Sequence, residues 1–310
     1  MLINSYWVRV QWAATFCGGL AILLHSPATA RCDDPFYMKA EDVLKNWSEK
    51  TGGKAREKIK NRVMNGTTEV PLLHIKGPVT VYASAPANKY EVWELSAGHA
   101  FERGCNGVYA WNVSGNNEPT ALTGPQKAVA LREAVFNLEL CWQEHYRSVE
   151  TTAIKRLKRL AIGDELATER TCFELKMTPR DEGADPEMWY IDTENFQRLA
   201  TITKVKVGDN VLDRTTLYAD YRPVDGVLEP FLICEQIDVQ RQIVVFKSIQ
   251  HNVRMSKYRF EVPESVKAKP KDDTSDKGGA TSATAAKPAG EKPAPTGQTP
   301  GDKPNEQRGG

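Results

Sequence analysis

A long series of short segments in which apolar and polar residues alternate constrains the fold of this chain more than any other feature. In Cys172–Met177, for example, Phe173, Leu175 and Met177 fall on one face. Such alternation is typical of a β-strand with one buried face. The pattern predicts about ten or eleven strands. The predicted strands are 59–64, 79–83, 90–95, 108–111, 172–177, 188–191, 199–207, 215–222, 230–237, 243–249 and 258–260.

Turn signals separate the predicted strands, among them Asn65-Gly66, Ala85–Asn88 and Pro223–Gly226. Consecutive strands that are joined by short turns pair in antiparallel fashion. A single sheet of this size has to curl or close. We therefore predict an α+β fold in which a strongly curved antiparallel sheet forms an unclosed half-barrel.

Two segments change to the helical period. Tyr37–Lys50 predicts a short amphipathic helix that ends at Gly52-Gly53. Pro125–Arg147 predicts the longest helix, apolar around much of its circumference, which favours burial on more than one side. Because the concave face of a curved sheet needs a filler, we expect the helices to cover that face. An apolar cavity is expected between sheet and helices, which is a common setting for a hydrophobic ligand.

The first thirty residues are typical of a secretory signal. Arg9 precedes an apolar stretch, Trp12–Leu24, and Ala28-Thr29-Ala30 supplies a small-x-small cleavage pattern. The sequence therefore predicts export across the inner membrane to the periplasm. The alternatives are an uncleaved anchor helix in place of the signal, and a lipid anchor through Cys32.

Residues 267–310 are rich in Lys, Pro, Ala, Gly, Ser and Thr and contain no aromatic residue. Such a segment buries too little apolar surface to offset the entropy of ordering, so we predict a disordered tail. It is interpreted either as a spacer in the cell envelope or as a tolerated extension. One domain, residues 31–266, remains between the two ends.

Charge and composition exclude one class of partner. The chain of 310 residues has 41 Lys+Arg against 40 Asp+Glu, a formal net charge of +1. This balance does not provide the broad basic surface of a general nucleic-acid binder. A hydrophobic content of 40% and a charged content of 26% are typical of a soluble globular protein, and we expect a monomer.

No combination of side chains predicts catalysis. His99 lies near Glu102 and Cys105 in the sequence, but no nucleophile motif such as GxSxG accompanies them. A solvated loop histidine is the alternative interpretation. The chain is therefore predicted not to be an enzyme.

The acidic residues and the histidines also predict neither a catalytic site nor a metal site. Asp185, Glu187 and Asp192 flank a predicted turn, where carboxylates are usually solvated. The histidines show no spacing typical of metal ligands, so neither metal nor cofactor is predicted. Among the five cysteines that remain after removal of Cys17, Cys172 and Cys234 could pair across a sheet, with buried free thiols as the alternative.

An ordered set of turn and strand residues resembles a known family. The set comprises Gly52-Gly53, Asn65–Thr67, Ile75–Gly77, Val79–Tyr82, Ala85–Lys89, Gly104–Trp111, Leu122–Gly124, Tyr221–Val227, Pro230-Phe231, Ile249, Asn252, Phe260 and Pro263. In this order it resembles the outer-membrane lipoprotein-sorting proteins of the LolA-like type over nearly all of residues 37–264. The resemblance implies an unclosed half-barrel with helices as a lid. It also implies a periplasmic role in which lipoprotein acyl chains, or another lipid, are held without chemistry, with envelope proteins or membrane complexes as further partners.

Apolar side chains are expected to line the cavity and bind the ligand. Each buried methylene of an acyl chain contributes about 0.8 kcal/mol, so apolar lining suffices. The alternative function is a structural or interaction module of the cell envelope in which the same residues form a filled core. The predicted lining residues are Val81, Trp93, Leu95, Trp111, Phe136, Leu140, Phe173, Leu175, Met177, Leu217 and Phe231.

Overall fold

The computed structural model describes residues 38–96, 99–158, 169–207 and 210–267. The predicted signal at 1–30, Cys32 and residues 268–310 lie outside these ranges. The strands are β1 (Asn61–Val70), β2 (Ile75–Ser84), β3 (Asn88–Ser96), β4 (His99–Asn106), β5 (Ala110–Ser114), β6 (Thr120–Ala121), β7 (Tyr146–Lys158), β8 (Glu169–Pro179), β9 (Glu187–Asp192), β10 (Arg198–Val207), β11 (Asn210–Val224), β12 (Val227–Ile237) and β13 (Gln240–His251). The helices are α2 (Ala40–Lys50), α3 (Lys54–Glu57), α4 (Gly124–Glu133), α5 (Leu138–His145) and α6 (Glu264–Lys267), with short 3₁₀ turns η1 (Pro71–Leu73) and η2 (Lys257–Phe260).

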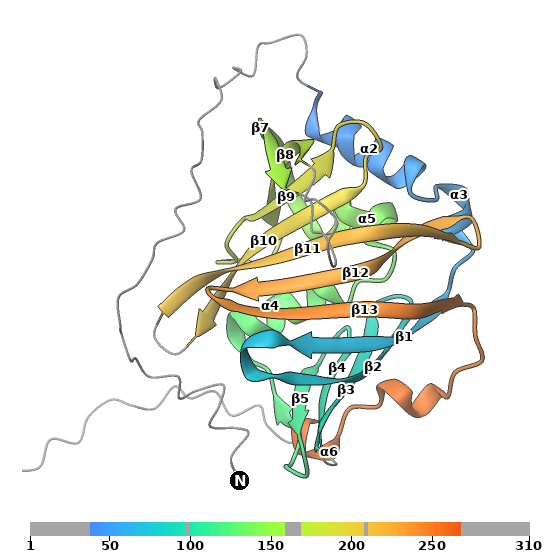
Figure 1. Cartoon of the computed structure of the whole chain (residues 1–310), viewed down its shortest axis with the longest axis vertical. Helices are drawn as coiled ribbons and strands as arrows, with labels where there is room; N and C mark the ends of the chain where they lie inside the picture. Colours follow the sequence, from blue (N-terminus) through green and yellow to red (C-terminus); the bar gives the residue numbers. More distant parts are fainter. Residues whose placement is uncertain (1–37, 97–98, 159–168, 208–209, 268–310) are drawn as a thin grey trace, which may run out of the picture. The chain divides into compact units, whose positions relative to one another are not determined.

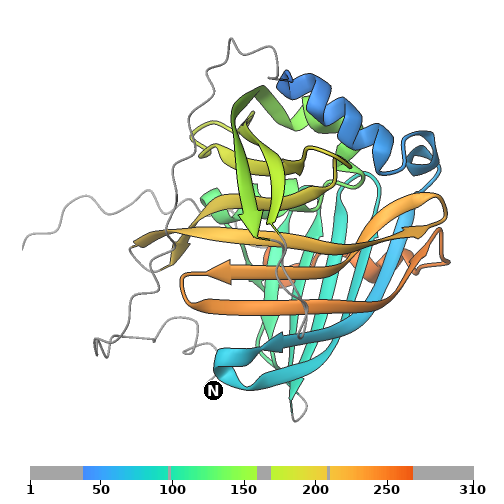
Figure 2. The ribbon, with the colours of Figure 1, turned by 45° about the horizontal axis from the view of Figure 1, so that its top comes forward.

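All thirteen strands form one antiparallel sheet in the order β6-β5-β4-β3-β2-β1-β13-β12-β11-β10-β9-β8-β7. Two meanders build it: β1–β6 run outward to one edge, and β7–β13 run back from the other edge until β13 pairs with β1. Among the described residues the edge strands β6 and β7 do not pair, so the sheet is curved but unclosed. Figure 2 shows the curvature, since β3–β5 cross behind β11–β13 at a steep angle. The predicted fold class is confirmed.

Helices α4 and α5 connect the two edges across the concave face, behind β11–β13 in Figure 1. Helix α4 contacts β4 and β5 in one wing of the sheet and β10 in the other. Helix α2 contacts β7 and α5 and covers the far end of the second wing. A long apolar segment between two meanders thus serves as the filler that a curved sheet requires.

The prediction of one continuous helix over 125–147 is wrong. Helix α4 ends at Glu133, and Asn137 adopts a left-handed conformation with φ 53° before α5 begins. Asparagine tolerates this conformation better than most residues, and one such residue interrupts a helix. The segment from Tyr146 onward is not helical but forms β7.

Three further local predictions differ from the structure. Asn65-Gly66 is not a turn: it lies inside β1 at a bulge against β13, and a side chain at Gly66 would overlap the backbone of Val245. Strands β4, β6 and β7 were not predicted. The segment 258–260 forms η2 rather than a strand, because the Ser256 hydroxyl accepts the Tyr258 N–H at 3.3 Å and starts a tight turn.

Candidate functional site

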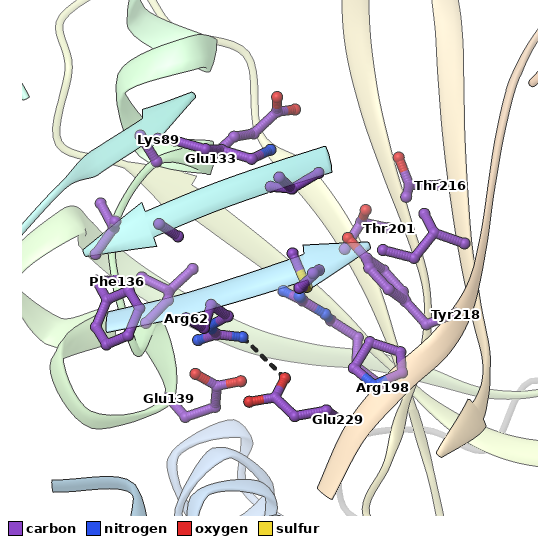
Figure 3. Close-up of a pocket in the computed structure, with 18 of the residues that line it drawn as sticks. Arg62, Lys89, Glu133, Phe136, Glu139, Arg198, Thr201, Thr216, Tyr218 and Glu229 are labelled. Carbon is purple, nitrogen blue, oxygen red and sulfur yellow. Dashed lines mark hydrogen bonds and ion pairs between the residues drawn. The ribbon is translucent and has the colours of Figure 1, made fainter. Parts of the chain in front are cut away.

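A cavity of about 250 Å³ lies between the concave face of the sheet and the segment that joins α4 to α5. Figure 3 shows its two sides, with Phe136, Arg62 and Glu139 on one and Tyr218, Thr216 and Arg198 on the other. Strands β1–β3 and β9–β13 contribute its walls, together with residues 132–139 of the helical cover. The cavity is therefore bounded by both layers of the fold.

Part of the cavity wall is apolar. Val79 and Val81 of β2 are buried, and Val79 is paired across the strands with Trp93 of β3, so their side chains share the concave face. Trp93 in turn stacks on Phe101 at 5.0 Å between ring centroids. These residues belong to one hydrophobic cluster that presents a continuous apolar wall. Its members that line the cavity are Met64, Val79, Val81, Trp93, Ile233, Val244 and Phe246.

Another part of the wall holds a charged network centred on Glu229 of β12. Arg62 of β1 donates to Glu229 Oε2 at 2.8 Å, and Arg56 of α3 lies 3.6 Å from Glu229 Oε1. His251 of β13 lies 3.2 Å from the same carboxylate, and Glu139 of α5 lies 3.5 Å from Arg56. Burial raises the pKa of Glu229, but Arg62, His251 and Arg56 together outweigh it and lower that pKa to about 2. The carboxylate therefore stays ionised and holds three elements at one point.

Asn137 fastens the helical cover to this network. Its side-chain amide donates to the backbone carbonyls of Arg56 at 3.0 Å and Ile59 at 3.2 Å, and its Oδ1 accepts from Arg62 at 3.1 Å. The break between α4 and α5 thus places a polar side chain where it bridges α3 and β1. Phe136, the preceding residue, packs over the Arg62 guanidinium at 4.8 Å.

A second polar network holds α4 against β9. Glu187 accepts from Arg132 Nε at 3.0 Å, from the Tyr146 hydroxyl at 2.8 Å and from Trp189 Nε1 at 3.0 Å. Burial and the neighbouring Glu187 carboxylate raise the pKa of Tyr146, so its hydroxyl stays protonated and donates. The connection between α4 and α5 is therefore held in place on both sides, at Arg132 and at Asn137.

The predicted solvated carboxylates are in fact partly structural. Glu187 and Asp192 are buried, and Asp192 accepts from Arg170 Nε at 2.7 Å, while Asp185 is exposed. Burial raises the pKa of Asp192, but the Arg170 hydrogen bond and backbone N–H groups outweigh it and lower that pKa. Among the described residues no group of His, Cys, Asp and Glu is arranged to hold a metal ion.

Three of the predicted lining residues, Val81, Trp93 and Phe136, do line the cavity. Leu95 lies in β3, but its side chain is outside those that the structure describes. Phe231 of β12 is buried beside the apolar wall without lining the cavity. Leu140 of α5 is 36% exposed and also lies away from it.

Phe173, Leu175 and Met177 share the concave face, as their alternation predicts, yet they are packed solidly. They form one core cluster with Val43, Leu44 and Trp47 of α2, and no lining residue of the cavity comes from β8. Helix α2 therefore fills this wing of the trough. The cavity borders this packed wing at Trp47 of α2 and Trp189 of β9, which belong to the core cluster and also line the cavity.

Trp111 and Leu217 lie on the opposite, convex face. Leu217 packs with Cys172 and Tyr190, whereas its neighbour Tyr218 lines the cavity. Trp111 packs under the C-terminal segment with Val262 and Val266. It also lines a second hollow of about 450 Å³ beside Tyr258, between the convex face of β3–β5 and the C-terminal segment.

Sequence reasoning missed the polar half of the cavity. Arg62, Asn137, Glu229 and Arg198 come from four separate segments, and no spacing in the sequence brings them together. The only local indication of these polar residues is that charged side chains occur at strand positions whose alternation otherwise predicts a core-facing apolar residue. Cys172 and Cys234, which the sequence allows to pair, are both free thiols. They lie on β8 and β12, which three strands separate.

Comparisons with known proteins add the following. No family model and no curated protein matches this chain. A DUF1329 family protein from Desulfovibrio piger has a similar structure, with 9% identity, 72% of this chain and 97% of that chain covered, and a TM-score of 0.50. A LolA superfamily protein from Nitrosomonas europaea aligns with 15% identity, 73% and 99% coverage and a TM-score of 0.48. A domain provisionally described as an outer membrane lipoprotein-sorting protein, from Vibrio parahaemolyticus, aligns with 13% identity, 71% and 97% coverage and a TM-score of 0.46.

At these identities the likeness is one of fold. The unclosed half-barrel predicted from the sequence is confirmed by the order of the sheet, in which β6 and β7 are edge strands among the described residues. Within the described residues no helix is long and apolar enough to cross a membrane.

Proposed function

We propose that this protein is a cell-envelope binding protein that holds the apolar part of a lipid in the concave-face cavity without chemistry. The observation that carries the proposal is unfilled space of about 250 Å³ beside a continuous apolar wall, between the sheet and its helical cover. Ligand pockets combine apolar lining with placed polar groups, and here the apolar wall stands beside charged side chains such as Arg62, Arg198 and Glu229. The periplasmic location rests on the signal predicted at residues 1–30, and the acyl chain of a lipoprotein is the ligand that the sequence resemblance implies.

The volume of the cavity sets the size of the cargo. About 250 Å³ holds on the order of eight water-sized groups at ~30 Å³ each. Eight methylenes would gain about 6 kcal/mol at ~0.8 kcal/mol per CH₂. Association itself costs at least about 4 kcal/mol, so apolar contact alone gives a weak complex. The space suits one acyl chain of medium length, and a cargo with several chains requires the α4–α5 segment to move away from the sheet.

Ligand uptake by matched variants tests the proposal. Lipid mass spectrometry of protein purified without detergent should find a bound amphiphile, and a fluorescent fatty acid should bind the protein after lipid removal. Val81→Phe adds a ring inside the cavity and takes the room of roughly two methylenes, which weakens binding about tenfold. Val63→Phe is the matched control, because Val63 is a half-buried β1 residue that faces away from the cavity.

Two results would reject lipid binding. One is a protein that is always found empty and takes up no fatty acid. The other is uptake that Val81→Phe leaves unchanged relative to Val63→Phe. Either would favour the alternative, an envelope interaction module with a filled core, for which the solid packing of Leu175 and Met177 under α2 is the supporting observation.

A further inference from the structure

Arg198, the first residue of β10, is an unusual charge in the wall of the cavity. Its guanidinium carbon lies 4.4 Å from the centroid of the Tyr218 ring, 5.0 Å from that of Trp189 and 5.4 Å from that of Trp47. Three aromatic rings from β11, β9 and α2 therefore surround one cation. Aromatic rings attract a cation through their faces but accept none of the hydrogen bonds that the in-plane N–H groups of a guanidinium can donate.

The other cations that line the cavity all have carboxylate partners. Arg62 pairs with Glu229 at 2.8 Å, Lys89 with Glu91 at 2.7 Å and Arg132 with Glu187 at 3.0 Å, while Arg56 lies 3.5 Å from Glu139. Among the described residues no carboxylate lies within ion-pairing distance of Arg198, and its side chain donates no hydrogen bond. Its Nε is buried without a partner. Burial lowers the pKa of Arg198, but Tyr218, Tyr221 and Glu139 outweigh it and raise that pKa, so the guanidinium stays charged.

Arg198 is half-buried, and its Nε is buried without a partner. A desolvated charge that lacks a hydrogen-bonding partner is unfavourable, and an anionic ligand would supply that partner. The position of Arg198 fits a ligand with two ends. Tyr218, which stacks on Arg198, is the cross-strand neighbour of Ile233, and Ile233 is the neighbour of Val244. Cross-strand neighbours share a face of the sheet, so this row leads from the cation to the apolar wall.

We propose that the cavity binds an anionic amphiphile, with the carboxylate or phosphate of its headgroup on the Arg198 guanidinium and its acyl chain along Ile233, Val244 and Phe246. This inference rests on the proposed lipid-binding function and adds the charge of the ligand and the residue that recognises it. A guanidinium suits both carboxylate and phosphate because it presents paired N–H donors to two oxygens.

A headgroup series tests this assignment separately from lipid binding. The full-length protein is titrated with decanoate, decyl phosphate, 1-decanol and decyltrimethylammonium, which share one chain and differ only in charge. The expected result is that both anions bind at least about tenfold more tightly than the alcohol, as a charge-assisted hydrogen-bonded contact implies. Inorganic phosphate and acetate are titrated alone; no saturable binding below the millimolar range is expected, because the chain must contribute.

Two variants complete the test. In Arg198→Gln the affinity for the anions should fall to within about threefold of the affinity for the alcohol, while the alcohol still binds. Arg198→Lys should keep a higher affinity for the anions than for the alcohol. The control is Arg259→Gln, because Arg259 also stacks on aromatic rings, at 4.3 Å from Tyr82, but lies outside the cavity. If Arg198→Gln does not fold, the wild-type series and Arg198→Lys still decide the question.

The outcomes separate the two claims. Equal affinity for the alcohol and the anions, or an anion preference that survives in Arg198→Gln, overturns the role of Arg198 and leaves lipid binding standing. Saturable binding of acetate or phosphate alone, unaided by a chain, assigns the site to a free anion and overturns the amphiphile. Binding of none of the four chains rejects both proposals.

Discussion

Replacement of Glu229 by Gln tests the charged network that fixes the helical cover. The Glu229 side chain is buried and faces Arg56 from α3, Arg62 from β1 and His251 from β13, with Glu139 of α5 beyond Arg56. Its pKa falls from the ordinary value of 4.5 to about 2. At 1.36 kcal/mol per tenfold change in proton affinity, this depression is worth about 3 kcal/mol of folding free energy.

The sign of the pH dependence follows from the depressed pKa. The stability that Glu229 contributes is fully present above about pH 4.5, the unfolded value, and is lost as the pH falls toward about 2. Gln resembles the protonated carboxyl group in size and charge. The unfolding free energy of the wild type should therefore exceed that of Glu229→Gln by about 3 kcal/mol at pH 7 and by only about 1 kcal/mol at pH 3, since protonation of Glu229 removes the remainder.

Urea unfolding at a series of pH values measures the difference between the two proteins. Contributions from other titrating carboxylates, such as Asp192 and Glu174, cancel in this difference because both proteins contain them. The control is Glu69→Gln, whose carboxylate forms an exposed pair with Lys76 at 3.0 Å and should change the unfolding free energy by less than about 0.5 kcal/mol. If the unfolding free energies of wild type and Glu229→Gln differ by the same amount at pH 3 and at pH 7, the proposed role of the Glu229 charge is refuted.

The remaining predictions concern packing. Leu175→Ala should lower the unfolding free energy by about 3 kcal/mol, because Leu175 is fully buried under α2, whereas Leu140→Ala, at a side chain 36% exposed, should lower it by less than about 1 kcal/mol in the same urea titrations. Similar losses of unfolding free energy in Leu175→Ala and Leu140→Ala would contradict the solid packing of β8 under α2. Gly104→Ala should lower the melting temperature in a circular dichroism scan, because a methyl group at Gly104 would overlap the indole of Trp111 on the next strand and overpacking costs about 1–3 kcal/mol. An unchanged melting temperature would show that Trp111 is free to move.

The sequence predicted the architecture because alternation and turn chemistry are local. The alternation of Phe173, Leu175 and Met177 correctly placed three side chains on one face of β8. Alternation does not tell which face of the sheet a residue occupies, and so it could not distinguish Trp93 on the concave side from Trp111 on the convex side. The same limit applies to Leu217.

Other errors arose where one residue type serves two purposes. Asn65-Gly66 is a strong turn signal, yet here the glycine permits close approach to β13 at a bulge within a strand. Nothing in the sequence around Asn137 indicates that the helix breaks there. The left-handed conformation of Asn137 is stabilised by hydrogen bonds with Arg56, Ile59 and Arg62, which are distant in the sequence. The polar half of the cavity depends on such long-range contacts and could not be predicted.

Photolabelling with a fatty acid that carries a diazirine on its chain tests most directly whether the concave-face cavity holds a lipid. After irradiation, peptide mapping reports which side chains the acyl chain touched. The account predicts labels on the walls formed by β1, β2, β12 and β13, at residues such as Met64, Val79 and Phe246, and their loss in Val81→Phe. Labels confined to the outer hollow beside Trp111 and Tyr258, or no labels at all, would contradict it.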